Sequence, residues 1–164
     1  MNRNLQELER TICYQFKEHG LFVQALTHSS YANEHRWNHS RCNERLEFLG
    51  DSVLSLIVAE YLFTHYKHYP EGDLTKLRAS LVCEKSLFIF ANRIGLGDFI
   101  RLGKGEENTG GRERPSIVSD AFEATLAAIY LDGGYEEAKR FVLRFMPEHM
   151  DLNRVSILSD YKTA

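Results

Sequence analysis

Apolar residues recur at intervals of three and four along nearly the whole chain, and this periodicity constrains the fold more than any other feature. In the first such segment the apolar positions are Leu5, Leu8, Ile12 and Phe16. No segment shows the sustained alternation of Val, Ile, Thr and Tyr that is typical of strands. The pattern predicts an all-α fold of about seven helices, over residues 3–18, 20–28, 43–66, 73–81, 84–94, 115–131 and 135–149.

Breaks rich in polar residues, glycine or proline separate these predicted helices. The YPEG segment at 69–72 ends the longest helix, and the DGG segment at 132–134 ends the next longest. Residues 30–42 and 101–114 are charged, polar or rich in glycine and are predicted to be surface loops. Pro115 suits the first turn of the helix that follows it.

Length and composition indicate one cytoplasmic domain. A chain of 164 residues can bury a core of its own without disulfides. No apolar run approaches the roughly 18–20 residues that cross a bilayer, and the first twenty residues do not read as a signal peptide, so no membrane partner is expected. Cys13, Cys42 and Cys83 are odd in number and form no CxxC pair, so they suggest neither a disulfide framework nor a zinc site.

Two of the predicted helices carry acidic stripes. Glu44, Glu47 and Asp51 have the spacing i, i+3, i+7, which places them within an arc of roughly 60° along about 10 Å of helix. Asp120 and Glu123 stand three residues apart on the later helix. Serines and alanines beside these stripes leave room for close helix packing. If the two stripes cross, the acids that meet are Glu47, Asp51, Asp120 and Glu123.

Carboxylates brought this close repel one another, and a cation relieves the repulsion. Oxygen ligands of this kind suit Mg²⁺ or Mn²⁺, which can activate water and stabilise the leaving oxygen in a phosphoryl displacement. Acids at this spacing on an amphipathic helix are, however, usually a solvated face. Spacing alone leaves both interpretations open.

A continuous motif at residues 43–54, NERLEFLGDSVL, resembles the signature of the ribonuclease III family without a gap. The resemblance extends over about residues 5–150. It is supported by five further segments, ALTH at 25–28, EGDL at 71–74, RASLV at 78–82, GG at 110–111 and PSIVSDAFEA at 115–124.

The resemblance implies an all-α catalytic domain at residues 1–150 that works as a homodimer on double-stranded RNA. Residues 151–164 then resemble a linker toward a double-stranded RNA-binding domain that is missing. By position, Glu47, Asp51, Asp120 and Glu123 match the metal ligands, and the catalytic residues are Asp51, Glu123 and the auxiliary acid Glu44. The implied cofactor is Mg²⁺, with Mn²⁺ as a substitute, and no organic cofactor is expected.

The implied reaction is hydrolysis of phosphodiesters by water, leaving 5′-phosphate and 3′-hydroxyl ends with a short 3′ overhang. Such an enzyme processes ribosomal RNA and other transcripts, including messenger RNA. The chain has 20 basic and 23 acidic residues, a balance unlike that of most nucleic-acid binders, and the missing domain would supply much of the phosphate affinity. The residues expected to face RNA are Glu71, Lys76, Arg78, Arg112 and Arg114.

Phe48 lies about 40° from Glu44 on the helical wheel, on the acidic side and away from the aliphatic stripe. Such an aromatic either packs under a neighbouring helix or contacts another chain. The resemblance favours the second alternative, because the equivalent position in the family lies in the subunit interface.

Three other protein classes fit the sequence less well. A non-catalytic RNA-binding relative would be expected to have lost some of the four acids. A di-iron bundle needs Glu-x-x-His, which is absent here. A generic helical interaction domain leaves the acidic stripes unexplained. The spaced pairs His35/His39 and His65/His68 are interpreted as surface side chains.

Overall fold

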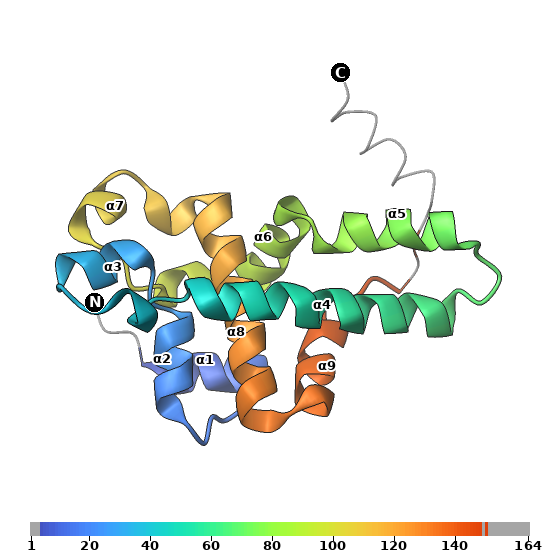
Figure 1. The fold of residues 1–164 in the computed structure, drawn as a ribbon, viewed down its shortest axis with the longest axis horizontal. Helices are drawn as coiled ribbons and strands as arrows, with labels where there is room; N and C mark the ends of the chain where they lie inside the picture. Colours follow the sequence, from blue (N-terminus) through green and yellow to red (C-terminus); the bar gives the residue numbers. More distant parts are fainter. Residues whose placement is uncertain (1–3, 149, 151–164) are drawn as a thin grey trace.

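The computed structural model describes residues 4–148 and 150, and this part of the chain is helical, without strands (Figure 1). Three short 3₁₀ turns, η1 (His39–Arg41), η2 (Leu96–Phe99) and η3 (Gly111–Glu113), lie between the helices. The α-helices are α1 (Leu5–Ile12), α2 (His19–Ala25), α3 (Ser29–Glu34), α4 (Glu44–His65), α5 (Glu71–Val82), α6 (Glu84–Arg93), α7 (Lys104–Asn108), α8 (Pro115–Gly133) and α9 (Tyr135–Leu143). The prediction of an all-α fold is therefore confirmed.

Helix α8 is the centre of the fold, and α4 crosses it along the long axis of the molecule (Figure 1). Every side chain from Ile117 to Ile129 is buried except that of Asp120, which is half-buried. A helix that is apolar on nearly all sides must be covered on nearly all sides. Helices α2, α4, α6 and α9 provide that cover, and the contact between α4 and α8 is the most extensive in the structure.

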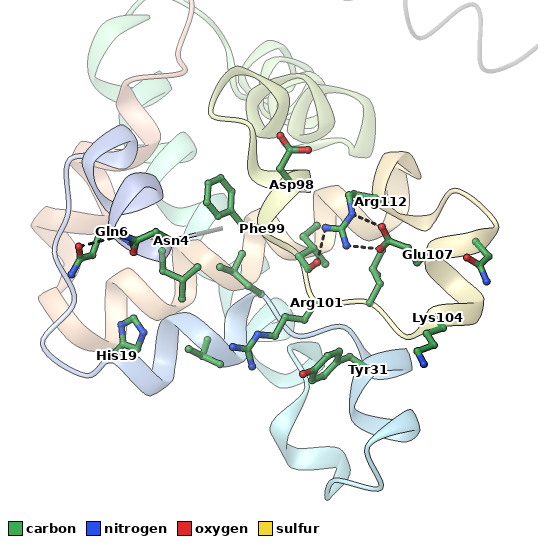
Figure 2. A pocket seen from close by; sticks show the side chains of 16 residues that line it. Asn4, Gln6, His19, Tyr31, Asp98, Phe99, Arg101, Lys104, Glu107 and Arg112 are labelled. Carbon is green, nitrogen blue, oxygen red and sulfur yellow. Dashed lines mark hydrogen bonds and ion pairs between the residues drawn. The ribbon is translucent and has the colours of Figure 1, made fainter. Parts of the chain in front are cut away.

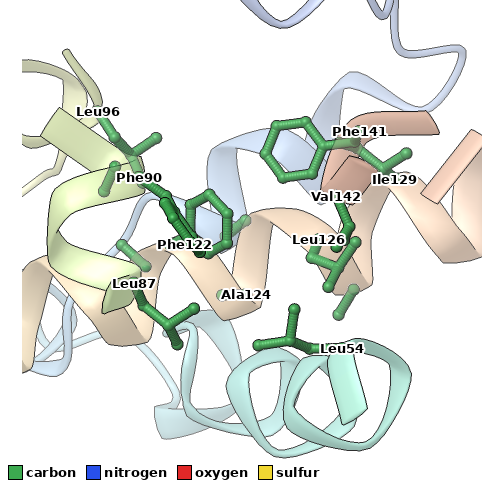
Figure 3. Packing of buried hydrophobic residues seen from close by; sticks show 14 of the residues in the cluster. Leu54, Leu87, Phe90, Leu96, Phe122, Ala124, Leu126, Ile129, Phe141 and Val142 are labelled. Carbon is green, nitrogen blue, oxygen red and sulfur yellow. The ribbon is translucent and has the colours of Figure 1, made fainter. Parts of the chain in front are cut away.

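Aromatic rings fill the space between α6, α8 and α9 (Figure 3). The ring of Phe122 lies 6.1 Å from that of Phe90 and 5.3 Å from that of Phe141, between centroids. Leu54 of α4 and Leu126 of α8 continue this cluster towards the helix crossing. The core therefore holds α8 from both sides, which fixes the position of its acidic residues.

The first helix is shorter than the periodicity predicted. It ends at Ile12 because Cys13 adopts a left-handed conformation with φ of 57°. Beyond this turn the amide of Phe16 donates to the carboxylate of Glu9, and the next two amides donate to Asp132 at the end of α8. The prediction of a helix to residue 18 was wrong, because these contacts with the side chains of Glu9 and Asp132 replace the helical hydrogen bonds.

The two predicted loops contain short helices, so the described residues have nine α-helices rather than about seven. Helix α3 begins one residue before the segment 30–42 and extends into it, and α7 lies in the segment 101–114. Contacts between them stabilise both: the amide of Lys104 donates to a carboxylate oxygen of Glu34 at 2.5 Å, and that of Gly103 to the hydroxyl of Ser30 at 2.9 Å.

At its C-terminal end the last helix stops at Leu143, short of the predicted residue 149. The predicted linker at 151–164 lies outside the described residues. Within the described part, no helix is both long enough and apolar enough to span a membrane.

Replacing Leu126 by alanine tests the role of α8 as the central helix. Leu126 is completely buried, so Leu126→Ala should lower the free energy of unfolding by about 2–5 kcal/mol. Leu131, on the same helix, is 52% exposed, and Leu131→Ala should change the free energy of unfolding by less than about 0.5 kcal/mol. Urea denaturation followed by circular dichroism measures both values. Equal effects of the two substitutions would contradict this arrangement.

Candidate active site

The start of α4 is anchored by Asn43, the residue that precedes it. Asn43 is 4% exposed, its amide donates to the carbonyl oxygen of Thr27 at 2.9 Å, and its side-chain amide donates to that of Ala25 at 3.1 Å. The carbonyl oxygen of Asn43 in turn accepts the amide of Glu47 at 2.8 Å. The first turn of α4, with its acidic residues, is thus held on the end of α2.

The backbones of α4 and α8 come into direct contact at Gly50. A Cβ atom at this position would lie 2.6 Å from the carbonyl carbon of Glu123, closer than real Cβ atoms approach. Only glycine permits this crossing. On α4, Glu47 lies one turn before this contact and Asp51 directly follows it. On α8, Asp120 lies one turn before Glu123, so the crossing brings the acids of the two helices towards each other.

At the crossing, carboxylate oxygens of Glu47, Asp120 and Glu123 lie within 4.8 Å of one another. Asp51 joins them through a hydrogen bond with Glu123. Glu123 is buried, Glu47 and Asp120 are half-buried, and Asp51 is exposed. The structure therefore brings together all four acids that the sequence grouped, at the edge between the core and the surface.

Burial and mutual repulsion raise the pKa values of three of these acids. Burial is the main cause for Glu123, whose pKa rises to about 9, and the hydrogen bond and charge of Asp51 add to it. Burial, followed by the charges of Glu47 and Glu84, raises the pKa of Asp120 to about 6. The pKa of Glu47 is raised by burial and by the charge of Asp51.

This donor set fits a hard divalent cation. Glu123 is buried, yet the protein gives it another carboxylate rather than a basic partner, so at neutral pH it holds a proton. A cation that displaces this proton would pair the charges that the protein leaves unpaired. All the donors are carboxylate oxygens, which favour Mg²⁺ or Mn²⁺ over thiophilic metals.

Glu44 lies beside this cluster without belonging to the close group. One of its carboxylate oxygens lies 2.6 Å from Nε2 of His39, and more than half of its side chain is exposed. Its charge still contributes to the raised pKa values of Glu47 and Asp120. Glu44 is therefore positioned at the rim of the cluster, open to solvent.

Two of the three arginines that were predicted to face RNA make contacts within the chain. Arg112 pairs with Glu107 and donates to the carbonyl oxygens of Gly97 and Ile100. Arg114 pairs with Glu106. These contacts hold η3 against neighbouring segments, so an RNA contact of either arginine stays a prediction.

The predicted residues on α5 are exposed. Lys76 and Arg78 project from this helix into solvent. The carboxylate of Glu71, in its first turn, accepts the hydroxyl of Thr75 at 3.0 Å. Phe48, on α4, is 79% exposed, so no neighbouring helix of the described part of the chain covers it.

An open pocket of about 840 Å³ lies between α1, α2, α3 and the segment around α7 (Figure 2). Its labelled side chains include Arg101, Tyr31 and the ion pair of Arg112 with Glu107. None of the four clustered carboxylates lines it. The acidic cluster is thus a surface site and not part of this pocket.

Comparison with known proteins identifies the family. A family model described as ribonuclease-III-like matches residues 18–149. The chain belongs to the ribonuclease III family. This confirms the family and the type of endoribonuclease that the sequence motifs predicted.

Curated relatives agree with this assignment. The chain is 53% identical over 160 residues to ribonuclease 3 of Caldanaerobacter subterraneus subsp. tengcongensis, covering 97% of this chain and 70% of that protein. It is 50% identical over 158 residues to ribonuclease 3 of Geobacillus thermodenitrificans, covering 96% of this chain and 64% of that protein. The chain therefore spans about two thirds of the length of these relatives.

Solved structures of the ribonuclease III nuclease domain from Campylobacter jejuni are similar to this one. One has a TM-score of 0.82 and 49% identity, and covers 91% of this chain and 99% of that chain. Another, described as showing structural flexibility in a region involved in dimer formation, has a TM-score of 0.80 and 51% identity, and covers 87% of this chain and 95% of that chain.

Three functional features escaped sequence reasoning. Gly50 lies inside the recognised motif, and a glycine in the middle of a predicted helix was the available signal of a close contact. Glu84, which raises the pKa of Asp120, belongs to neither acidic stripe. The contact of His39 with Glu44 depends on the turn η1, which lies in a segment predicted to be a loop.

Gly50→Ala should destabilise the protein by about 1–3 kcal/mol, because the added methyl group meets the backbone of α8. Gly72→Ala is the matched control, since Gly72 is also helical and has open space around its Cβ position. The control should be neutral or stabilising by up to about 1 kcal/mol. Urea denaturation measures both effects, and a neutral Gly50→Ala would contradict the close crossing.

The stability of the metal-free chain should fall as the pH rises. The pKa of Glu123 is about 9 in the folded state against 4.5 ordinarily, so the folded state binds more protons in this window. Between pH 6 and 8 the free energy of unfolding of the native chain should drop by about 2–3 kcal/mol more than that of Glu123→Gln. Denaturation in EDTA measures the difference. Glu113→Gln, which alters an exposed acid outside the cluster, should show the same dependence of the free energy of unfolding on pH as the native protein. If Glu123→Gln also showed the native pH dependence, the raised pKa of Glu123 would be contradicted.

Proposed function

We propose that this chain is the catalytic part of an endoribonuclease that hydrolyses double-stranded RNA with Mg²⁺ held by Glu47, Asp51, Asp120 and Glu123. The observation that carries the proposal is the convergence of these four carboxylates at the contact between Gly50 and the backbone of Glu123, in a chain of the ribonuclease III family. Mn²⁺ suits the same oxygen ligands and would serve as a substitute.

When bound, Mg²⁺ supplies an activated water and stabilises charge on the phosphate oxygens. Glu123 holds a proton in the metal-free state and must release it when the ion is bound. Exposed Asp51 provides a ligand on the solvent side, where the RNA backbone approaches, and Glu44 lies at the rim as an auxiliary acid. As the family resemblance implies, water attacks the phosphorus and the bond from phosphorus to the 3′ oxygen breaks. The 3′ oxygen leaves with a proton, so the products carry 5′-phosphate and 3′-hydroxyl ends.

Exposed apolar side chains along α4 support a homodimer. Phe48, Leu56 and Phe63 are 79%, 58% and 76% exposed, and they recur at intervals of eight and seven residues along this helix. A row of exposed apolar side chains is typical of a protein interface. We propose that a second copy of the chain covers it, and the relative from Campylobacter jejuni has a region described as involved in dimer formation. Two sites in one dimer would cut both strands and leave a short 3′ overhang.

The RNA duplex would also contact residues outside the acidic cluster. Lys76 and Arg78 on α5 are exposed and available to phosphates, with Glu71 in the first turn of the same helix. Processing of ribosomal RNA and other transcripts in the cytoplasm follows from the family resemblance and stays a prediction.

Nuclease activity tests the central part of the proposal. A long RNA duplex at low salt should be cut in Mg²⁺ but not in EDTA, and Glu123→Gln should reduce the rate at least about 100-fold because a ligand is lost. Glu113→Gln should retain the native rate. Gel analysis of the products should show 5′-phosphate ends. If the folded native protein left the duplex intact, a non-catalytic RNA-binding relative would be favoured. If Glu123→Gln cut the duplex at the native rate, the assigned site would be contradicted.

Phe48→Glu should dissociate the homodimer, because a charged side chain would be buried in the interface. Leu131→Glu is the control, since Leu131 is similarly exposed but lies on α8. Sedimentation equilibrium should show at least a tenfold weaker association for the first variant and the native value for the second. An unchanged dimer in Phe48→Glu, or a native monomer, would contradict the assignment of this face.

A further inference from the structure

A second group of metal-ligating side chains lies at the start of α4, next to the carboxylate cluster. A nitrogen of His39, the sulfur of Cys42 and a carboxylate oxygen of Glu44 all lie within 4.8 Å of one another. We propose that these three residues bind a thiophilic divalent cation of the Zn²⁺ class at a site separate from the one that holds Mg²⁺.

The ligand set selects this class of ion. Zn²⁺ takes thiolate, imidazole and carboxylate ligands together, whereas Mg²⁺ takes oxygen ligands and does not favour a thiolate. The four acids at the helix crossing offer only oxygen. The two neighbouring sites therefore differ in the metals that they prefer, and cytosolic Mg²⁺ would not compete for the sulfur.

The backbone that carries the ligands is held in place by hydrogen bonds. The side-chain oxygen of Asn38 accepts the amide of Ser40 and caps η1. The side chain of Gln24 donates to the carbonyl oxygens of Ser40 and Cys42, at 3.0 and 3.3 Å. Together with the anchored Asn43, these bonds fix a short turn from which all three side chains arise. Such supporting contacts orient ligands in metal sites.

The site has one buried and two exposed ligands. Cys42 is 2% exposed, whereas the side chains of His39 and Glu44 are 63% and 53% exposed. Three protein ligands with an open side leave the fourth position of a tetrahedral ion to water. The metal would thus be accessible from solvent, and its thiolate would be shielded.

Little movement is needed to admit the ion. Nε2 of His39 and the oxygen of Glu44 are 2.6 Å apart, and two ligands at about 2.0 Å from a tetrahedral ion lie about 3.3 Å apart. The two exposed side chains must therefore separate by less than about 1 Å. On binding, His39 ligates as a neutral imidazole whose N–H proton lies on Nδ1, and the thiol proton of Cys42 passes to the buffer, because a metal ligand must be deprotonated.

Glu44 connects this site to the carboxylate cluster. Its negative charge acts on Glu47 and Asp120 in the metal-free state. A cation bound through Glu44 would cancel that charge and would withdraw the carboxylate from the rim of the proposed active site. Metal binding itself does not depend on the proposed nuclease activity, because the sulfur ligand lies outside the carboxylate cluster.

Co²⁺ titration tests the proposal, because a Co²⁺–thiolate bond absorbs in the near ultraviolet. The whole chain, reduced and in excess Mg²⁺ to occupy the carboxylates, should develop this band with about one equivalent of Co²⁺ per chain. Zn²⁺ should remove the band by displacement. The band should be lost in Cys42→Ser, and the affinity for Co²⁺ should fall about tenfold or more in His39→Ala.

Matched controls identify the thiol and the site. Cys13→Ser and Cys83→Ser should leave the band unchanged, and Glu47→Gln should do the same because it alters only the carboxylate cluster. His39 is exposed, so His39→Ala tests the site even if Cys42→Ser fails to fold. The absence of a band in the native chain, or a band that keeps its intensity and affinity in Cys42→Ser or His39→Ala, would overturn the proposal. Loss of nuclease activity with an intact band would count only against the proposed function.

Discussion

The candidate active site depends on one backbone contact, that of Gly50 in α4 with Glu123 in α8. Two helices that meet without a side chain between them bring the residues of their facing turns unusually close. Here those residues are acids, so the contact buries Glu123 among other carboxylates. Burial first, and then the hydrogen bond and the charges of these neighbours, raises the pKa of Glu123 to about 9. Burial of the aromatic and aliphatic core around α8 offsets the unfavourable free energy of placing these acids together, and it holds the helices in contact. The protein thus uses its core to maintain an arrangement that a cation would relieve.

Sequence periodicity predicted the long helices well, because their apolar faces follow from local spacing. It failed where long-range contacts decide the boundaries. The end of α1 at Ile12 is accompanied by amide contacts with Asp132, which lies more than a hundred residues further along the chain. Helices α3 and α7 support each other through the amide of Lys104 and the carboxylate of Glu34. No local pattern can show such contacts.

For the site, spacing placed acids on one face of each helix, but only the family motif brought the two faces together. The close group of Glu47, Asp120 and Glu123 could therefore be anticipated, whereas the raised pKa values required the burial that the structure shows. The group of His39 and Cys42 could not be anticipated, because its spacing matches no zinc motif and its geometry arises from the turn η1. The start of α4 thus combines two kinds of metal-ligating chemistry within a few residues.

Proton release on metal binding tests the central claim most directly. Calorimetric titration of the chain with Mn²⁺ at pH 8, in buffers of different ionisation enthalpy, measures the protons released per bound ion. Because the pKa of Glu123 is about 9, the acid is mostly protonated at this pH, and binding at the crossing should release about one proton per site. Binding of Mn²⁺ without proton release would show that the ion does not engage Glu123, and would contradict a metal centre at the contact of α4 and α8.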